Sequence, residues 1–167
     1  MELKQLNILL ADDDIDDCIF FKVALEEFPL STRLTSVHDG EQLMQLLTHE
    51  TNELPHVLFL DLNMPRKNGF ECLSEIKLIK KLEQLPVIMY STSFEQEVVN
   101  LLYKNGAQHF IRKPSDFSQF KKIVQQTLTA IAHERPTGQA GSSGNTTNTS
   151  QQTRENFVLT VQDGLMD

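Results

Sequence analysis

The chain has 167 residues, of which 40% are hydrophobic, and it carries a formal net charge of -8 at pH 7. A chain of this length can bury the core of one domain, and its negative charge argues against direct binding of nucleic acid, which requires a basic face. The sequence holds no apolar run near the roughly 20 residues that span a bilayer and no signal-peptide pattern at its N-terminus, so it predicts a cytoplasmic protein that does not enter a membrane.

Strand-like and helix-like segments alternate along the first 133 residues. Apolar or alternating runs predict the strands, and apolar residues spaced three or four positions apart predict the helices. In chain order, we expect a strand at 6–11, a helix at 15–28, a strand at 32–37, a short helix after 39–40, a strand at 56–60, a helix at 69–80, a strand at 86–90, a helix at 95–104, a strand at 108–111 and a helix at 115–132.

Five strands, each followed by a helix, predict a doubly wound α/β fold with helices on both faces of a parallel sheet. Crossovers between parallel strands are nearly always right-handed. In such sheets, ligands bind beyond the carboxyl ends of the strands, where the strand order reverses. We therefore expect the functional site at that edge of the sheet.

The composition changes sharply after His133. Residues 134–156 are mostly small and polar, which predicts a flexible linker. Residues 157–167 form a short tail that opens with the apolar, β-prone Phe157, Val158 and Leu159. Two interpretations of this tail stay open, because such a segment can dock on the domain or fray at its end.

Polar residues of distinct chemistry follow four of the predicted strands: Asp12 and Asp13, then Asp61, Ser91 and Lys113. If the first and third strands are neighbours, their carboxylates meet, and each close pair would repel by roughly 4 kcal/mol at an effective dielectric constant near 20. Mg²⁺ would offset this repulsion, since it prefers carboxylate and phosphate oxygens. Asp61 is then the candidate nucleophile for a phosphoryl group, whose oxygens Lys113 and Ser91 would hold.

These segments resemble the receiver domain of two-component response regulators, of the CheY-like type. The resemblance covers residues 1–133 and rests on four motifs, which are Ile8 to Asp14, Phe59 to Pro65 with Gly69, Val87 to Ser91, and Phe110 to Pro114. It implies a flavodoxin-like (βα)5 fold with a five-stranded sheet in the order 2-1-3-4-5. It also implies a stand-alone, single-domain regulator.

The resemblance assigns roles to the residues at the strand ends. Asp61 would accept the phosphoryl group from the phosphohistidine of a sensor histidine kinase. Mg²⁺ would be bound by Asp13, Asp61 and the backbone carbonyl of Asn63, with Asp12 contributing through water. Lys113 would pair with the phosphoryl group.

The resemblance also implies a switch. Ser91 matches the switch hydroxyl residue and Phe110 the switch aromatic residue. On phosphorylation Ser91 would move toward the phosphate and Phe110 would turn inward, which repacks the face formed by the fourth helix, fifth strand and fifth helix. Asn63 and Ser93 match positions that tune hydrolysis of the phosphoryl group, and a cis bond is implied before Pro114.

The predicted function is that of a phosphoacceptor signalling domain rather than an enzyme, with at most self-catalysed phosphorylation and dephosphorylation. It would signal to an unknown downstream protein by changing its binding surface. One alternative is a phosphorelay intermediate that passes the group to a histidine phosphotransfer protein. A less favoured alternative is an aspartyl-nucleophile phosphohydrolase, because the run from Asp12 to Asp16 lacks the Thr or Val that closes the motif of that class.

Overall fold

The computed structural model describes residues 5–49, 53–134 and 157–159. The linker predicted from composition lies outside the described residues except for Glu134, and so does the tail beyond Leu159.

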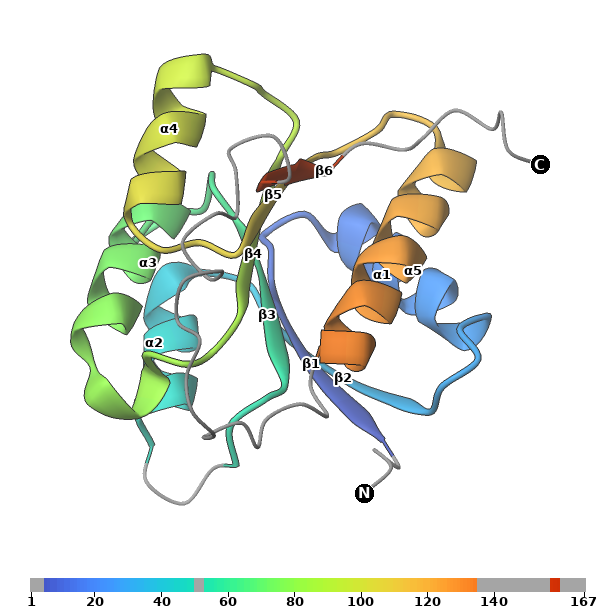
Figure 1. Ribbon diagram of the computed structural model, residues 1–167, viewed down its shortest axis with the longest axis horizontal. Coiled ribbons are helices and arrows are strands. Elements are labelled where there is room, and N and C mark those ends of the chain that lie inside the picture. The colour runs from blue at the N-terminus through green and yellow to red at the C-terminus, as the bar shows by residue number, and fades with distance from the viewer. Residues whose placement is uncertain (1–4, 50–52, 135–156, 160–167) are drawn as a thin grey trace, which may run out of the picture.

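The described residues form alternating strands and helices (Figure 1). The strands are β1 (Leu6–Ala11), β2 (Thr32–Val37), β3 (Val57–Asp61), β4 (Val87–Ser91), β5 (His109–Arg112) and β6 (Val158–Leu159). The helices are α1 (Ile15–Glu26), α2 (Gly40–Thr48), α3 (Gly69–Leu78), the short 3-10 helix η1 (Lys80–Leu82), α4 (Gln96–Lys104) and α5 (Phe117–Glu134).

The strands form one parallel sheet in the order β2-β1-β3-β4-β5-β6. The predicted α/β fold and the order of the first five strands are therefore confirmed. The sheet is extended by β6, which the sequence marked only as β-prone. Strand order reverses beside β1, so the carboxyl ends of β1 and β3 frame the expected site.

Strands β3, β4 and β5 each begin and end one residue later than the sequence predicts. The ladder pairs Asp61 with Tyr90 and Ser91 with Arg112, so polar residues take part in the sheet up to its edge. Hydrophobic patterning marks where apolar side chains stop, whereas backbone pairing continues past that point. Asp61 and Ser91 are therefore the last residues of their strands.

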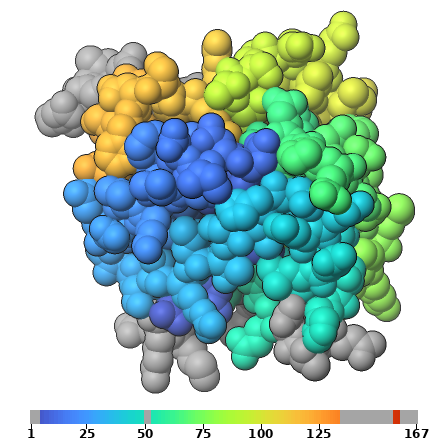
Figure 2. All heavy atoms as spheres, turned by 180° about the vertical axis from the view of Figure 1, so that it is seen from behind, coloured from blue at the N-terminus to red at the C-terminus, as the bar shows by residue number. Residues whose placement is uncertain are grey.

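Two helical layers cover the sheet. Helices α2, α3 and α4 lie on one face, and α1 and α5 lie side by side on the other (Figures 1 and 2). Successive side chains of a strand point to opposite faces of the sheet and so pack under different helices. Leu58 packs in the cluster under α2, α3 and α4, whereas Phe59 packs under α1 and α5. The Phe59 ring meets that of Phe21 on α1 edge to face, with centroids 4.8 Å apart. None of the helices in the described residues has both the length and the apolar character needed to span a bilayer.

Helix α1 buries Phe21, Ala24 and Leu25 but leaves other apolar side chains partly exposed. Four of them are between 36% and 57% exposed: Ile15, Ile19, Phe20 and Val23. A helix that only covered a sheet would turn such residues inward. Helix α1 therefore presents an apolar surface, formed by these four residues, close to the carboxyl end of β1.

Candidate functional site

Charged side chains from separate elements meet at the carboxyl ends of the strands. Lys113, which follows β5, places its Nζ 3.4 Å from Asp61 Oδ2, at the end of β3, and 3.2 Å from Asp12 Oδ2, after β1. The same Nζ lies 2.9 Å from Asp17 Oδ2 in the first turn of α1. Strands β1 and β3 are neighbours, and Lys113 reaches them across the end of β4. The structure thus brings together three of the residues that the sequence singled out.

The aspartates that follow β1 have different surroundings. Asp14 caps α1, since its Oδ1 accepts from the backbone N–H of Asp16 at 2.9 Å. Asp12, Asp13 and Asp61 instead each place a carboxylate oxygen within 4.8 Å of the other two. Because Asp14 caps α1, Asp12 and Asp13 lie before the helix, at the carboxyl end of β1.

The cluster of Asp12, Asp13 and Asp61 could hold a divalent cation such as the predicted Mg²⁺. Its donors are hard carboxylate oxygens, and close carboxylates repel each other unless a cation lies between them. Asp12 is 0% and Asp61 5% exposed, whereas Asp13 is open to solvent, which leaves room for the water that Mg²⁺ retains. The residues present therefore fit the predicted metal.

The environment of Asp61 disfavours its charge. Burial raises the pKa of Asp61 to about 7, and the nearby charge of Asp12 adds to the rise, although Lys113 acts in the opposite direction. The backbone N–H of Asn63 donates to Asp61 Oδ1 at 3.1 Å and favours the carboxylate. Asp61 is therefore easier to protonate than an ordinary aspartate, and carboxyl groups with such shifted pKa values gather at functional sites.

Lys113 remains protonated within this cluster. Burial alone would lower the pKa of Lys113, but the facing carboxylates of Asp61, Asp12 and Asp17 raise it above its ordinary value. The ammonium group is therefore a fixed positive charge beside Asp61.

Two residues of the site were missed by the sequence interpretation. Asp17 lies in the first turn of the predicted helix, where an acidic residue is ordinarily explained by the helix dipole, yet it is an ion-pair partner of Lys113. Tyr90 ends a predicted buried strand, where a large ring ordinarily only packs, yet its hydroxyl donates to Asp12 Oδ2 and its ring centroid lies 4.2 Å from Lys113 Nζ. The sequence does contain one sign that Tyr90 belongs to the site, because it places a polar hydroxyl at the end of a predicted buried strand.

The predicted switch residues form a second group beside the acidic cluster. Ser91 Oγ accepts from Asn63 Nδ2 at 3.4 Å and from the backbone N–H of Ser93 at 3.2 Å. Phe110 is 1% exposed and meets Phe94 edge to face, with ring centroids 5.8 Å apart. Its ring therefore lies inward, beside a cavity of about 150 Å³ that Asn63 and Ser93 also line.

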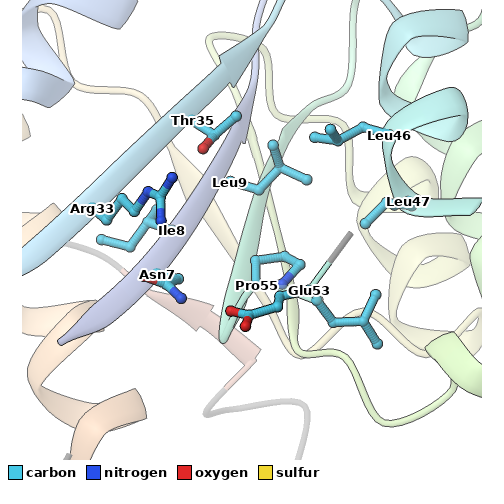
Figure 3. A pocket seen from close by; sticks show the side chains of 10 residues that line it. Asn7, Ile8, Leu9, Arg33, Thr35, Leu46, Leu47, Glu53 and Pro55 are labelled. Carbon is cyan, nitrogen blue, oxygen red and sulfur yellow. The ribbon is translucent and has the colours of Figure 1, made fainter. Parts of the chain in front are cut away.

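Two further observations concern the loops and the opposite edge of the sheet. The described residues contain no cis peptide bond, so the implication of a cis bond before Pro114 is wrong for this structure. A cavity of about 340 Å³ lies near the amino ends of β1 and β3, and its lining includes Asn7, Arg33 and Glu53 (Figure 3). None of the strand-end residues described above lines this cavity, so it is separate from the site.

The comparison with protein families accounts for this arrangement. A family model described as the response regulator receiver domain matches residues 8–125. The chain belongs to this family. Receiver domains act in signalling and are not conventional enzymes, which agrees with the predicted class.

Curated relatives and solved structures point the same way. Response regulator Rcp1 of Synechocystis is 30% identical over 122 residues, which are 71% of this chain and 83% of the relative. The probable methanogenesis regulatory protein FilR2 of Methanothrix harundinacea is also 30% identical over 122 residues, 71% of this chain and 79% of FilR2. Among solved structures, the phosphorylated cyanobacterial phytochrome response regulator RcpA has a TM-score of 0.70 at 29% identity, covering 74% of this chain and 91% of RcpA. The Mn²⁺-bound form of Rcp1 has a TM-score of 0.70 at 28% identity, covering 74% of this chain and 92% of that one.

Proposed function

We propose that this receiver domain accepts a phosphoryl group on Asp61 from the phosphohistidine of a sensor histidine kinase. The observation that carries the proposal is the meeting of Asp61 with Lys113, 3.4 Å away, and with the acidic pair Asp12 and Asp13. A carboxylate nucleophile between a fixed cation and a cation-binding cluster suits the transfer of a phosphoryl group. Two solved relatives are described as phosphorylated and as Mn²⁺-bound, which supports the same chemistry here.

The transfer exchanges one bond to phosphorus for another. A carboxylate oxygen of Asp61 attacks the phosphorus atom, and the bond from phosphorus to the histidine nitrogen breaks. The electron pair of that bond stays on the imidazole of the kinase. Attack requires the charged carboxylate, which Lys113 favours against the burial that raises the pKa of Asp61 to about 7.

Asp13, Asp61 and the backbone carbonyl of Asn63 would hold Mg²⁺, with Asp12 contributing through water. Bound there, Mg²⁺ would neutralise charge on the phosphoryl oxygens. Lys113 would turn from its carboxylate partners to one phosphoryl oxygen, and the Ser91 hydroxyl would donate to another. Because Asn63 already donates to Ser91, movement of Ser91 would alter the loop that carries Asn63.

The output is a changed protein-binding surface over α4, β5 and α5. Ser91 at the end of β4 and Phe110 on the adjacent β5 connect Asp61 to this surface. Asn63 and Ser93 would tune how long the phosphoryl group lasts. We place this chemistry in the cytoplasm, where the ATP that charges a histidine kinase is available.

Phosphorylation with a small donor tests the assignment of Asp61. Acetyl phosphate with Mg²⁺ is expected to add one phosphoryl group to the wild-type chain, as measured by intact-protein mass, and none to Asp61→Asn. Asp14→Asn is the matched control, because asparagine also caps a helix and Asp14 lies outside the cluster of three carboxylates. Removal of Mg²⁺ with a chelator should suppress labelling of the wild type. Undiminished labelling of Asp61→Asn would refute the proposal.

A further inference from the structure

The C-terminal segment Phe157–Leu159 occupies the edge of the sheet. Strand β6 pairs in parallel with β5, so that Val158 lies opposite Phe110 and Leu159 opposite Ile111. Figure 1 shows β6 beside β5, between α4 and α5. An unpaired edge strand can pair with other chains, and β6 covers this edge.

The side chains of this segment are packed into the domain. Phe157 is 3% exposed and belongs to the apolar cluster that contains Phe110. Its ring meets the ring of Tyr103 on α4 edge to face, with centroids 5.1 Å apart. Val158 packs against the same cluster, whereas Leu159 packs against the cluster under α1 and α5. Three consecutive residues therefore contact both layers of the fold.

The segment flanks the switch residue. Phe110 has Met89 of β4 opposite it on one side and Val158 of β6 on the other. Without β6, Phe110 would lie on the edge strand, and its ring could leave the core past that edge. With β6 in place, the inward position of the ring is enclosed on both sides.

We propose that Phe157–Leu159 is a detachable intramolecular ligand of the β5 edge, and that its docking is linked through Phe110 to phosphorylation of Asp61. The linkage rests on the function proposed above. Docking holds Phe110 inward, and the inward ring is the position implied for the phosphorylated state. Coupling between two binding events is reciprocal, so phosphorylation strengthens docking and docking strengthens phosphorylation.

The ligand comes from the same chain. Residues 135–156 separate α5 from the segment, and 22 residues can extend over roughly 70 Å at about 3.3 Å each. This reach exceeds the length of any helix in the domain, so the segment can reach β5 of its own molecule. A partner that binds over α4, β5 and α5 must then compete with it.

Hydrogen exchange on the full-length chain, without a phosphodonor, tests the docking. Phe157→Asp is expected to speed exchange of the backbone amides of β5 by about tenfold, because the segment leaves the edge. Leu78→Asp is the matched control, since it makes the same kind of change at a side chain that is 86% exposed on α3. If exchange in β5 is unchanged in Phe157→Asp, the segment is not docked there. If exchange is also faster in β1 and β3, the whole domain has been loosened, and the segment cannot detach by itself. Protection of β5 that grows with protein concentration would show exchange between two copies and would overturn the intramolecular assignment.

Beryllium fluoride with Mg²⁺, an analogue of the phosphoryl group, tests the linkage. The wild type is expected to gain protection in β5 when the analogue binds, and Phe157→Asp to bind the analogue about three- to tenfold more weakly. Equal binding by the wild type and Phe157→Asp would overturn the linkage. If the wild type bound no analogue and took no label from acetyl phosphate, the function proposed for Asp61 would fail together with the linkage. The docking measured without a donor would stand in that case.

Discussion

At the scale of single residues, Lys113 is the point where the charges of the site meet. Its ammonium group contacts the carboxylates of Asp12, Asp17 and Asp61, and the face of the Tyr90 ring lies beneath it. Tyr90 also donates its hydroxyl to Asp12, so one buried side chain fixes both an anion and a cation. Burial would raise the pKa of Asp12, but the charge of Lys113 and the Tyr90 hydroxyl lower it below its ordinary value. Asp12 is therefore held as a charged group by Lys113 and Tyr90.

Replacing Tyr90 with phenylalanine isolates the role of this hydroxyl. Tyr90→Phe keeps the ring next to Lys113 and removes only the donor to Asp12. The free energy of unfolding is expected to fall by about 1 to 3 kcal/mol, since a buried charged acceptor loses one hydrogen bond. Urea unfolding at pH 7 measures the change.

A double-mutant cycle controls for changes in packing. In the Asp12→Asn background, Tyr90→Phe should cost clearly less, because the charged acceptor is no longer present. Strict additivity of the two substitutions would contradict the assigned interaction.

At the scale of elements, the start of α1 and the start of α3 border the site in different ways. Gly69 opens α3 so close to the loop that follows Asp61 that a Cβ there would lie 2.3 Å from the carbonyl oxygen of Asp61. Glycine thus lets α3 pack against the loop. Helix α1 begins after Asp14 and carries the exposed apolar surface of Ile15, Ile19, Phe20 and Val23. An apolar surface beside the mouth of a site suits a protein partner, and we expect the kinase proposed above to contact it.

Substitution of Ile19 separates kinase docking from chemistry. Ile19→Asp is expected to slow phosphotransfer from a purified histidine kinase that labels the wild type by about tenfold or more, because a charge enters the apolar contact. Labelling by acetyl phosphate should be unchanged, since Ile19 is 52% exposed and lies outside the charged cluster. Leu78→Asp, on α3, should alter neither rate. Equal losses with both donors would point to a change in the site itself and contradict the docking role.

At the scale of the whole molecule, the buried carboxylate of Asp61 lowers stability at neutral pH. Burial raises the pKa of Asp61 from 3.8 to about 7, so the folded chain retains a proton there that the unfolded chain releases. Between about pH 4 and pH 7 the unfolded state binds fewer protons at this group, and stability falls as the pH rises. Above about pH 7, Asp61 is charged in both states, and the full cost of burying its charge lowers the free energy of unfolding.

Because the charge of Asp61 lowers stability as the pH rises, Asp61→Asn should stabilise the chain more at high pH than at low pH. Without metal, the variant should match the wild type near pH 4 and exceed its free energy of unfolding by up to about 4 kcal/mol at pH 8. This upper limit follows from about 1.4 kcal/mol per pKa unit over the rise from 3.8 to about 7, and that rise already includes the attraction to Lys113. Urea unfolding at several pH values measures the difference, and Mg²⁺ should narrow it by stabilising the wild type. A difference that does not vary with pH would show that the charge of Asp61 is not the cause.

The sequence by itself determined the alternation of strands and helices and the residues at the strand ends. Asp61 is recognisable because it closes an apolar run, and the parallel sheet then fixes on which edge it lies. These features depend on local periodicity and on the general rules of βαβ connection, which a single sequence contains. The ends of β3, β4 and β5 were placed one residue early, because backbone pairing leaves no mark in hydrophobic patterning.

The tertiary structure alone decided which distant residues share the site. Tyr90 and Asp12 are 78 positions apart, and Lys113 and Asp17 are 96 apart, yet each pair is in direct contact. The place of Phe157 against Tyr103 likewise depends on an edge that exists only once β5 has formed. Such contacts arise when elements pack, and the chemistry of one residue does not specify its partner. The physical reason is that a sequence encodes local preference directly, whereas long-range pairing follows from burial of the whole chain.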